Sequence, residues 1–257
     1  MGLGATSQQF LREVETLTGL PVEVEIDERL QAPLLARFQM ARGAVPFHRV
    51  SYHPSAGAMA DYLIAYQCSF ALRLYALPAS ERFDLADSAA AVSDSLAWAK
   101  AFPTCASLPL DRQETFAAFV RTSLMSMIRS IPVGLWIDRE LRRLHPGLRE
   151  PQEQAIRRQI DTHASLFRPE IRRNIPEAPF QMNLAINAAF AKFWGKELGQ
   201  SAWTLPYLAV GALVRGEALL QRSDALPPMP GNDRRLIQAW AEELGLGTWI
   251  QWVPYVP

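Results

Sequence analysis

Cysteine and histidine are scarce in this sequence, which has two cysteines and four histidines among 257 residues. Cys68 and Cys105 form no close pair and match no zinc-ligand spacing, and no two histidines stand three or four residues apart. A disulfide framework and a histidine-rich metal site are therefore not expected. We predict reduced thiols, with Cys68 as a buried structural residue and Cys105, close to Pro103, more exposed.

A surplus of charge of one sign is also missing, because 26 Lys and Arg balance 26 Asp and Glu. Net charge therefore gives no support to a nucleic-acid or membrane partner. No uncharged apolar run reaches the length of a membrane span, and residues 1–10 show no basic stretch followed by an apolar one. We expect a cytoplasmic protein with no membrane partner, long enough to bury a large core.

The common nucleotide-binding and hydrolase signatures are absent. The chain has no Walker loop, no dinucleotide-binding glycine fingerprint after a strand, and no Gly-x-Ser-x-Gly elbow. The apolar stretch Val210–Gly216 contains Gly211 and Gly216, and glycines in such a stretch favour close helix packing over phosphate binding. We therefore expect no cofactor.

The N-terminal part of the chain changes its hydrophobic period. Residues 6–17 have helical spacing, whereas residues 22–26 alternate valine or isoleucine with glutamate, as in a half-buried strand. Leu35–Ala41 and Phe47–Tyr52 are predicted as the two strands of a hairpin. A helix over Leu34–Arg42 stays open as an alternative, because short apolar runs are ambiguous.

The chain is organised around Asp61–Leu77, a stretch that ends at Pro78. It is apolar nearly all round, so a helix here would be buried, and Asp61 could cap its start. Its few polar side chains belong to Gln67, Cys68, Ser69 and Arg73. Polar groups in a core need partners, so these residues indicate a specific structural or functional role.

After Pro78 the sequence is predicted to be helical, and Pro132 is expected to end one helix. The aromatic tail Trp249–Tyr255 should pack back as an extended segment. The predicted fold class is α+β and mostly helical, with a small N-terminal sheet on a buried central helix and a helical C-terminal half. A soft boundary near residue 131 would separate an α+β region from a helical region, both packed in one compact unit. The two regions are 1–130 and 131–257, and the expected later helices cover 84–100, 111–130, 136–144, 150–167, 182–198, 206–221 and 233–244.

The order of the N-terminal elements resembles a known family. A helix, a Gly-Leu-Pro turn, a strand, a hairpin ending in His48–Tyr52, a loop and a buried helix follow one another. This order is similar to that of ImmA/IrrE-type metallopeptidases, zincin-like proteins associated with phage-repressor cleavage and stress response. In that family the buried helix carries His-Glu-x-x-His, whose histidines bind zinc and whose glutamate polarises the attacking water. The resemblance covers residues 8–127.

Laid on this sequence, the motif falls on Tyr66–Phe70, which reads Tyr-Gln-Cys-Ser-Phe. The phenylalanine has no lone pair for a metal, a neutral tyrosine is a poor zinc ligand, and glutamine cannot act as a general base. The family's third ligand corresponds to Glu114 in the run Gln113–Val120, and Arg73 could pair with Glu114. The resemblance therefore implies a degenerate site that holds no metal.

Three interpretations of these residues stay open. In the first, Tyr66 and Gln67 are hydrogen-bonded residues of the core. In the second, they line a pocket that binds a ligand without cleaving it. In the third, Tyr66, Gln67, Arg73 and Glu114 form the polar pocket of an enzyme. The function that we favour is a catalytically inactive zincin-like protein that acts through a protein partner. A bacterial regulatory or defence setting is implied by the resemblance alone.

An arginine-rich middle region, Arg139–Arg173, gives one further alternative. Acidic residues interleave with its arginines, which is typical of a solvated face with weak ion pairs. A surface for nucleic acid or for an acidic protein is the other reading, although aromatic residues for base stacking are absent there.

Overall fold

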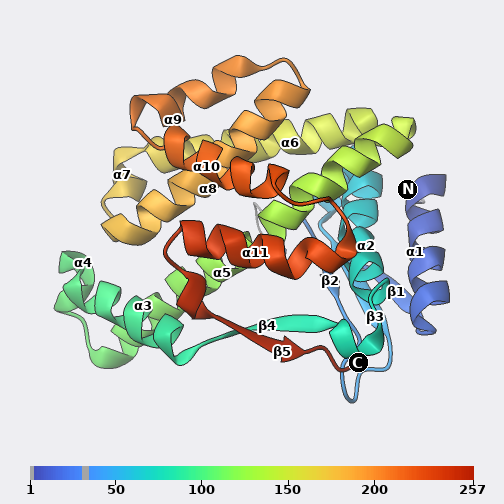
Figure 1. Ribbon diagram of the computed structural model, residues 1–257, viewed down its shortest axis with the longest axis horizontal. Coiled ribbons are helices and arrows are strands. Elements are labelled where there is room, and N and C mark those ends of the chain that lie inside the picture. Colours follow the sequence, from blue (N-terminus) through green and yellow to red (C-terminus); the bar gives the residue numbers. More distant parts are fainter. Residues whose placement is uncertain (1–2, 31–34) are drawn as a thin grey trace. The chain divides into compact units, whose positions relative to one another are not determined.

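The computed structural model describes residues 3–30 and 35–257 (Figure 1). Contacts divide the chain into two compact units that interleave along the sequence. The sheet unit comprises Met1–Asp84, Trp136–Gln159 and Pro254–Pro257, and the helical unit comprises Leu85–Leu135 and Ile160–Val253. The crossing between Leu135 and Trp136 lies close to the soft boundary expected near residue 131. The division into regions 1–130 and 131–257 stays a prediction.

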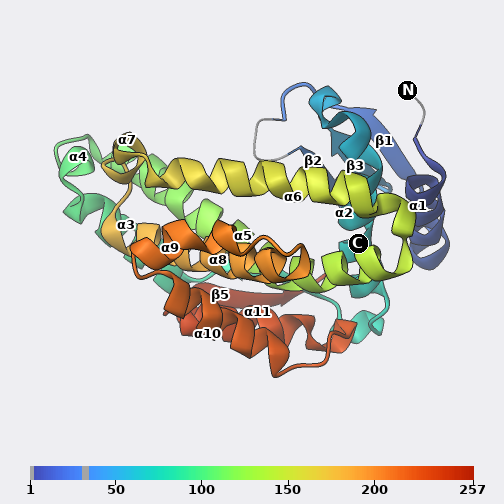
Figure 2. The ribbon, with the colours of Figure 1, turned by 90° about the horizontal axis from the view of Figure 1, so that it is seen from above.

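The sheet unit begins with helix α1, Ala5–Thr18, which ends at Gly19. Gly19 has φ 71°, a left-handed conformation that favours glycine, and its N–H donates to Glu15 O. At the other end, Asp61 accepts hydrogen bonds from Gly4 N–H and the Ser7 hydroxyl, both at 2.7 Å. Asp61 was expected to cap its own helix. It binds the start of α1 instead, because α1 lies beside the helix that contains Asp61, α2, Ala60–Tyr75 (Figures 1 and 2).

A three-stranded sheet follows, with the order β1-β3-β2. Its strands are β1, Val22–Ile26, β2, Ala36–Gln39, and β3, His48–Tyr52. β1 pairs with β3 in parallel, and β2 pairs with β3 antiparallel. The predicted hairpin is thus confirmed, and the alternative helix is wrong over the described part of Leu34–Arg42; Leu34 itself lies outside the described residues. The turn between β2 and β3 carries a further bridge, because the main chains of Arg42 and Val45 bond each other.

The central helix α2, Ala60–Tyr75, packs on β2 and β3 and beside α1. Ile64, Ala65, Cys68 and Ala71 are fully buried. The prediction of a buried helix against a small sheet is therefore confirmed, and with it the mostly helical α+β fold class.

Helix α5 runs without interruption from Leu110 to Leu144 and contains Pro132. The prediction that Pro132 ends a helix is therefore wrong. Proline removes one backbone hydrogen bond and costs about 3 kcal/mol inside a helix. The apolar residues around it, Ile131, Val133 and Leu135, are all buried, so packing on both sides of the proline offsets this cost.

Two further short strands are present, one where helix was expected and one in the aromatic tail. β4 is Phe83–Asp87 and β5 is Ile250–Pro254, and the two pair as a two-stranded sheet. The helix predicted from residue 84 begins only at Ala89, where the Ser88 hydroxyl accepts from Ala91 N–H. The extended conformation predicted for the aromatic tail is confirmed.

The other predicted helices are confirmed in part, because the one expected over 206–221 is broken at Gly211, whose φ of 74° is left-handed. Among the described residues, no helix combines the length and the apolar character that a bilayer crossing requires. These helices are α3, Ala89–Ala101, α4, Pro103–Ala106, α6, Arg149–Ala164, α7, Pro169–Arg172, α8, Glu177–Glu197, α9, Leu205–Ala209, α10, Leu213–Asp224, and α11, Asp233–Glu243.

Gly216 allows α10 to approach α8 closely, as its position in an apolar stretch predicted. A Cβ at this residue would lie 2.7 Å from Ala189 N and 2.8 Å from Ala188 Cβ. We expect Gly216→Ala to lower the free energy of unfolding by about 1–3 kcal/mol, because the backbone of α8 must move. Urea unfolding measures this change.

The matched control is Gly231→Ala, because a Cβ there meets nothing within 4 Å. Alanine is otherwise favoured over glycine inside a helix. A Gly216→Ala protein as stable as the wild type would contradict the close approach of α8 and α10.

Candidate functional site

Tyr62, Tyr66 and Phe70 form a row of aromatic rings along α2. Tyr66 and Phe70 meet edge to face, with ring centroids 5.2 Å apart. Tyr62, one turn earlier, continues the row with its ring centroid 5.9 Å from that of Tyr66. Spacing of four residues places all three on one face of the helix. Tyr66 and Phe70, which the sequence resemblance aligns with zinc-binding histidines, therefore pack edge to face against each other.

Gln67, which the sequence resemblance aligns with a catalytic glutamate, acts in this structure as a hydrogen-bond donor. Its Nε2 lies 3.3 Å from the carbonyl oxygen of Ala36 on β2. This bond ties the central helix to the edge of the sheet. Because a carboxylate has no hydrogen to donate, a glutamate at this position could not make the same bond.

Arg73 and Glu114 lie in different units. Arg73 is buried, with 8% of its surface exposed, and its guanidinium carbon lies 5.6 Å from the centre of the Trp136 ring. This geometry is that of a cation–π contact. Glu114 is an exposed residue of α5 in the helical unit. The pairing of Arg73 with Glu114 stays a prediction, whereas Tyr66, Gln67, Phe70 and Arg73 all belong to the sheet unit.

A buried carboxyl group that the sequence reasoning missed lies next to the aromatic row. Asp138 Oδ1 accepts a hydrogen bond of 2.7 Å from the Tyr62 hydroxyl. Gln152 Nε2 donates to the main-chain oxygen of Asp138 at 2.9 Å and approaches Oδ1 at 3.3 Å. Asp138 is 3% exposed, Tyr62 4% and Gln152 0%. We call these three residues the Asp138 cluster.

Burial controls the ionisation of this cluster. It raises the pKa of Asp138 to about 7, against the opposing effect of the hydrogen bonds from Tyr62 and Gln152. Burial, followed by the nearby Asp138 charge, also raises the pKa of Tyr62 and of Tyr66 well above the usual value for tyrosine. The signal in the sequence was an acidic residue directly after the apolar run Val133–Ile137.

The cysteines lie in the core. Cys68 is fully buried and Cys105 is 4% exposed, and both are free thiols. The prediction for Cys68 is confirmed, whereas Cys105, expected to be more exposed, is buried as well. Burial raises the pKa of Cys68 to about 12, so this thiol is not activated as a nucleophile. Among the described residues, no group of three or more His, Cys, Asp and Glu side chains is placed to hold a metal ion.

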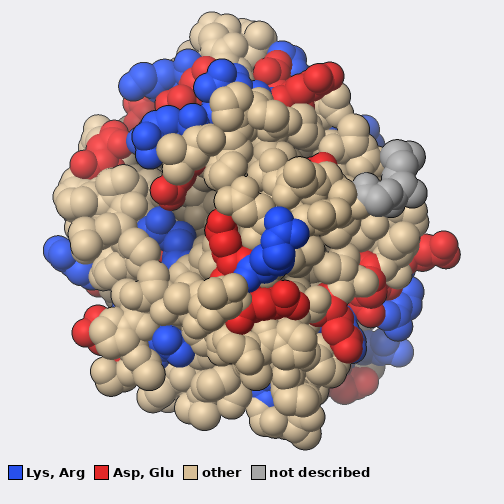
Figure 3. All heavy atoms as spheres, turned by 90° about the vertical axis from the view of Figure 1, so that its right-hand side faces the viewer, with Lys and Arg blue, Asp and Glu red and all other residues tan. Residues whose placement is uncertain are grey.

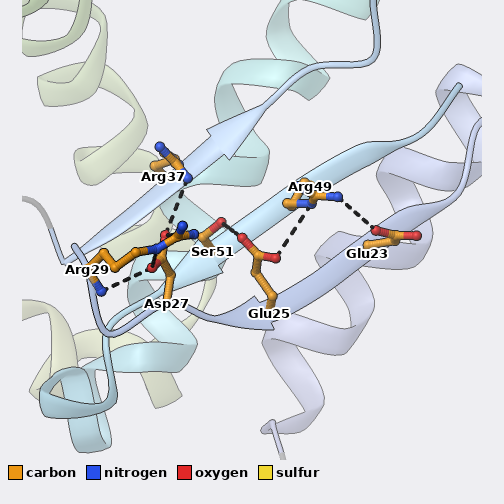
Figure 4. Close-up of polar contacts among 7 residues, drawn as sticks. All are labelled: Glu23, Glu25, Asp27, Arg29, Arg37, Arg49 and Ser51. Atoms are coloured by element: carbon orange, nitrogen blue, oxygen red, sulfur yellow. Dashed lines mark hydrogen bonds and ion pairs between the residues drawn. The ribbon is translucent and has the colours of Figure 1, made fainter. Parts of the chain in front are cut away.

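The face of the sheet that carries the glutamates of β1 bears a network of ion pairs (Figure 4). Arg49 on β3 lies between two residues of β1, with distances of 3.4 Å to Glu23 and 3.6 Å to Glu25. Glu25 also accepts from the Ser51 hydroxyl at 2.7 Å. At the end of β1, Asp27 pairs with Arg29 and with Arg37, and the hydrogen bond from Arg29 lowers its pKa. We call these seven residues the charged sheet face: Glu23, Glu25, Asp27, Arg29, Arg37, Arg49 and Ser51.

The arginine-rich middle region also contains ion pairs. Arg157 bonds Glu153 at 2.8 Å on α6, and Arg172 bonds Glu177 at 2.5 Å. These ion pairs fit a solvated, mixed-charge surface. Basic and acidic side chains also lie next to one another on the face of the molecule drawn in Figure 3. Binding of nucleic acid stays a prediction.

Comparison with models of protein families, with curated proteins and with solved structures finds no match for this chain.

Proposed function

We propose that this chain is a catalytically inactive, zincin-like protein that acts by binding a protein partner. The bacterial regulatory or defence setting is what the resemblance to ImmA/IrrE-type proteins implies. The observation that carries the proposal is the hydrogen bond from Gln67 to Ala36. The position that would supply the catalytic base is used to hold the central helix to the sheet.

The packing around Gln67 supports the same conclusion. Tyr66 and Phe70 pack edge to face, and the Tyr62 hydroxyl donates a hydrogen bond to Asp138. None of the three aromatic rings offers a good zinc ligand at neutral pH. A site built in this way has no zinc ligand and no general base, so binding is the activity that we propose for it.

Metal analysis tests the proposal directly. The purified chain is incubated with zinc, dialysed, and measured for metal per chain beside a known zinc peptidase as positive control. We expect no stoichiometric zinc and no zinc-dependent cleavage of a denatured protein substrate. One zinc per chain, or cleavage that a chelator abolishes, would overturn the proposal.

The role of Gln67 gives a separate prediction. We expect Gln67→Glu to lower the free energy of unfolding by about 1–3 kcal/mol at pH 8, because the Ala36 carbonyl loses its donor and faces a carboxylate. Chemical denaturation measures the change. Gln39→Glu, on an exposed position of β2, is the matched control and should have little effect. A Gln67→Glu protein of unchanged stability that gains zinc-dependent cleavage would show that the position belongs to a hydrolytic site.

A second candidate function, an enzyme with a polar pocket beside α2, is favoured by one observation. Burial gives Asp138 a pKa of about 7 with a tyrosine hydroxyl 2.7 Å away, a combination that suits general acid–base catalysis. Perturbed carboxyl groups also occur in structural networks, and the Asp138 cluster is almost completely buried. We therefore place this function second.

A further inference from the structure

β1 is an edge strand of the sheet, and no strand within residues 3–30 and 35–257 pairs with its outer edge. Two hydrogen bonds at the ends of the β1–β3 pair show which residues of β1 turn their main-chain groups toward β3. His48 N–H donates to Pro21 O, and Asp27 N–H donates to Tyr52 O. In a parallel pair, alternate residues turn their main-chain groups toward the neighbouring strand. The main-chain groups of Val22, Val24 and Ile26 therefore point away from β3.

The open edge offers unused hydrogen-bonding groups. Val22 N–H donates to the Glu15 carboxylate at 3.0 Å. For Val24 and Ile26, no such partner is found in the described part of the chain. Their apolar side chains are also exposed, 37% for Val24 and 61% for Ile26. Natural sheet edges are commonly protected by charged side chains, proline or a bulge. Val22–Ile26 contains no proline, and its charged side chains are Glu23 and Glu25.

Two carboxylates on β1 share a single arginine beside this edge. Glu23 and Glu25 lie on β1, and 55% and 36% of their side chains are exposed. Arg49 forms an ion pair with each of them. Arg49 is on β3, so the carboxylates lie between it and the open edge (Figure 4). A strand added to β1 would place alternate side chains beside Glu23 and Glu25, and the others beside Val24 and Ile26.

The side chains of β1 indicate which kind of strand could pair with its outer edge. Basic side chains would complement the glutamates, and apolar side chains would cover the valine and isoleucine. A second copy of β1 fits poorly, because antiparallel pairing of two copies places glutamates of both chains opposite each other, and like charges across a strand pair are destabilising. The edge therefore suits a different chain with alternating basic and apolar residues.

We propose that the open edge of β1 binds an extended segment of a partner protein by strand addition, with basic side chains beside Glu23 and Glu25 and apolar side chains beside Val24 and Ile26. This inference rests on the proposed function as a protein-binding scaffold. Backbone hydrogen bonds would supply affinity, and the two rows of side chains would supply selectivity.

The probe is a labelled peptide of alternating lysine and valine, measured by fluorescence anisotropy on the full chain. The first control peptide has the same composition in two blocks, and the second is N-methylated on the residues whose N–H groups would face β1. Val24→Pro is the matching protein variant, because proline removes an N–H group that points away from β3 and is tolerated on edge strands. Hydrogen exchange of the Val24 and Ile26 amides provides a readout at the site.

We expect the alternating peptide to bind and to slow exchange at Val24 and Ile26. N-methylation and Val24→Pro should each weaken binding about tenfold or more. Equal binding of the block peptide, undiminished binding after N-methylation, or no binding up to about 1 mM would overturn the edge proposal. The N-methylated peptide keeps the test decisive if Val24→Pro does not fold. If the peptide does not bind and the chain holds no zinc, only the proposal of strand addition at β1 is rejected. Stoichiometric zinc would reject the proposed function.

Discussion

Asp138→Asn is expected to raise the free energy of unfolding at pH 8 by on the order of 4 kcal/mol. Burial raises the pKa of Asp138 in the folded protein to about 7, from an ordinary value of 3.8. The folded state therefore holds a proton that the unfolded state has lost, and stability declines as the pH rises from about 4 to 7. Asparagine carries no charge and can still accept from Tyr62, so the variant avoids this loss.

The difference between variant and wild type is the quantity to measure, by chemical denaturation at pH 5 and pH 8. The wild-type profile alone is ambiguous, because burial lowers the pKa of His163 to about 4, and its contribution grows with pH over part of the same range. Asp161→Asn, on an exposed position of α6, is the matched control. A variant that is no more stable than the wild type at pH 8 would show that Asp138 is not a buried, uncompensated carboxylate there.

Tyr255→Ala is expected to lower the free energy of unfolding by about 3–5 kcal/mol. The Tyr255 hydroxyl donates to Ala41 O at 2.8 Å, and its N–H donates to Arg82 O at 3.1 Å. Its ring packs against Tyr75, and the Arg42 guanidinium lies over it at 5.5 Å. Tyr255 is 4% exposed, so removing the ring leaves a cavity in the sheet unit.

Thermal unfolding should show a decrease in Tm of about 10 °C, because a domain of this size loses about 2–4 °C per kcal/mol. Tyr255→Phe keeps the ring and loses the bond to Ala41, so its expected cost is about 1 kcal/mol. Val256→Ala, next to it and 71% exposed, is the control. Equal Tm values for Tyr255→Ala and Val256→Ala would mean that the tail does not anchor the sheet unit.

Much of the fold was predictable because it depends on local periodicity. The alternation in 22–26 and the apolar stretch Asp61–Leu77 each determine their own secondary structure, whatever the rest of the chain does. Of the candidate site, the residues of α2 were predictable for the same reason. Tyr66, Gln67 and Phe70 were identified by their position on one helix.

The partners of those residues were not predictable. Asp138 meets Tyr62 across 76 positions of sequence, and Tyr255 meets Ala41 across 214. The same holds for β4, whose pairing with β5 overrode a helical pattern, and for Pro132, which the packing of buried neighbours keeps inside a helix. Sequence pattern by itself thus determined which segments become helix or strand at the centre of this protein. Tertiary structure alone decided which buried polar groups meet, because only packing brings distant residues within bonding distance.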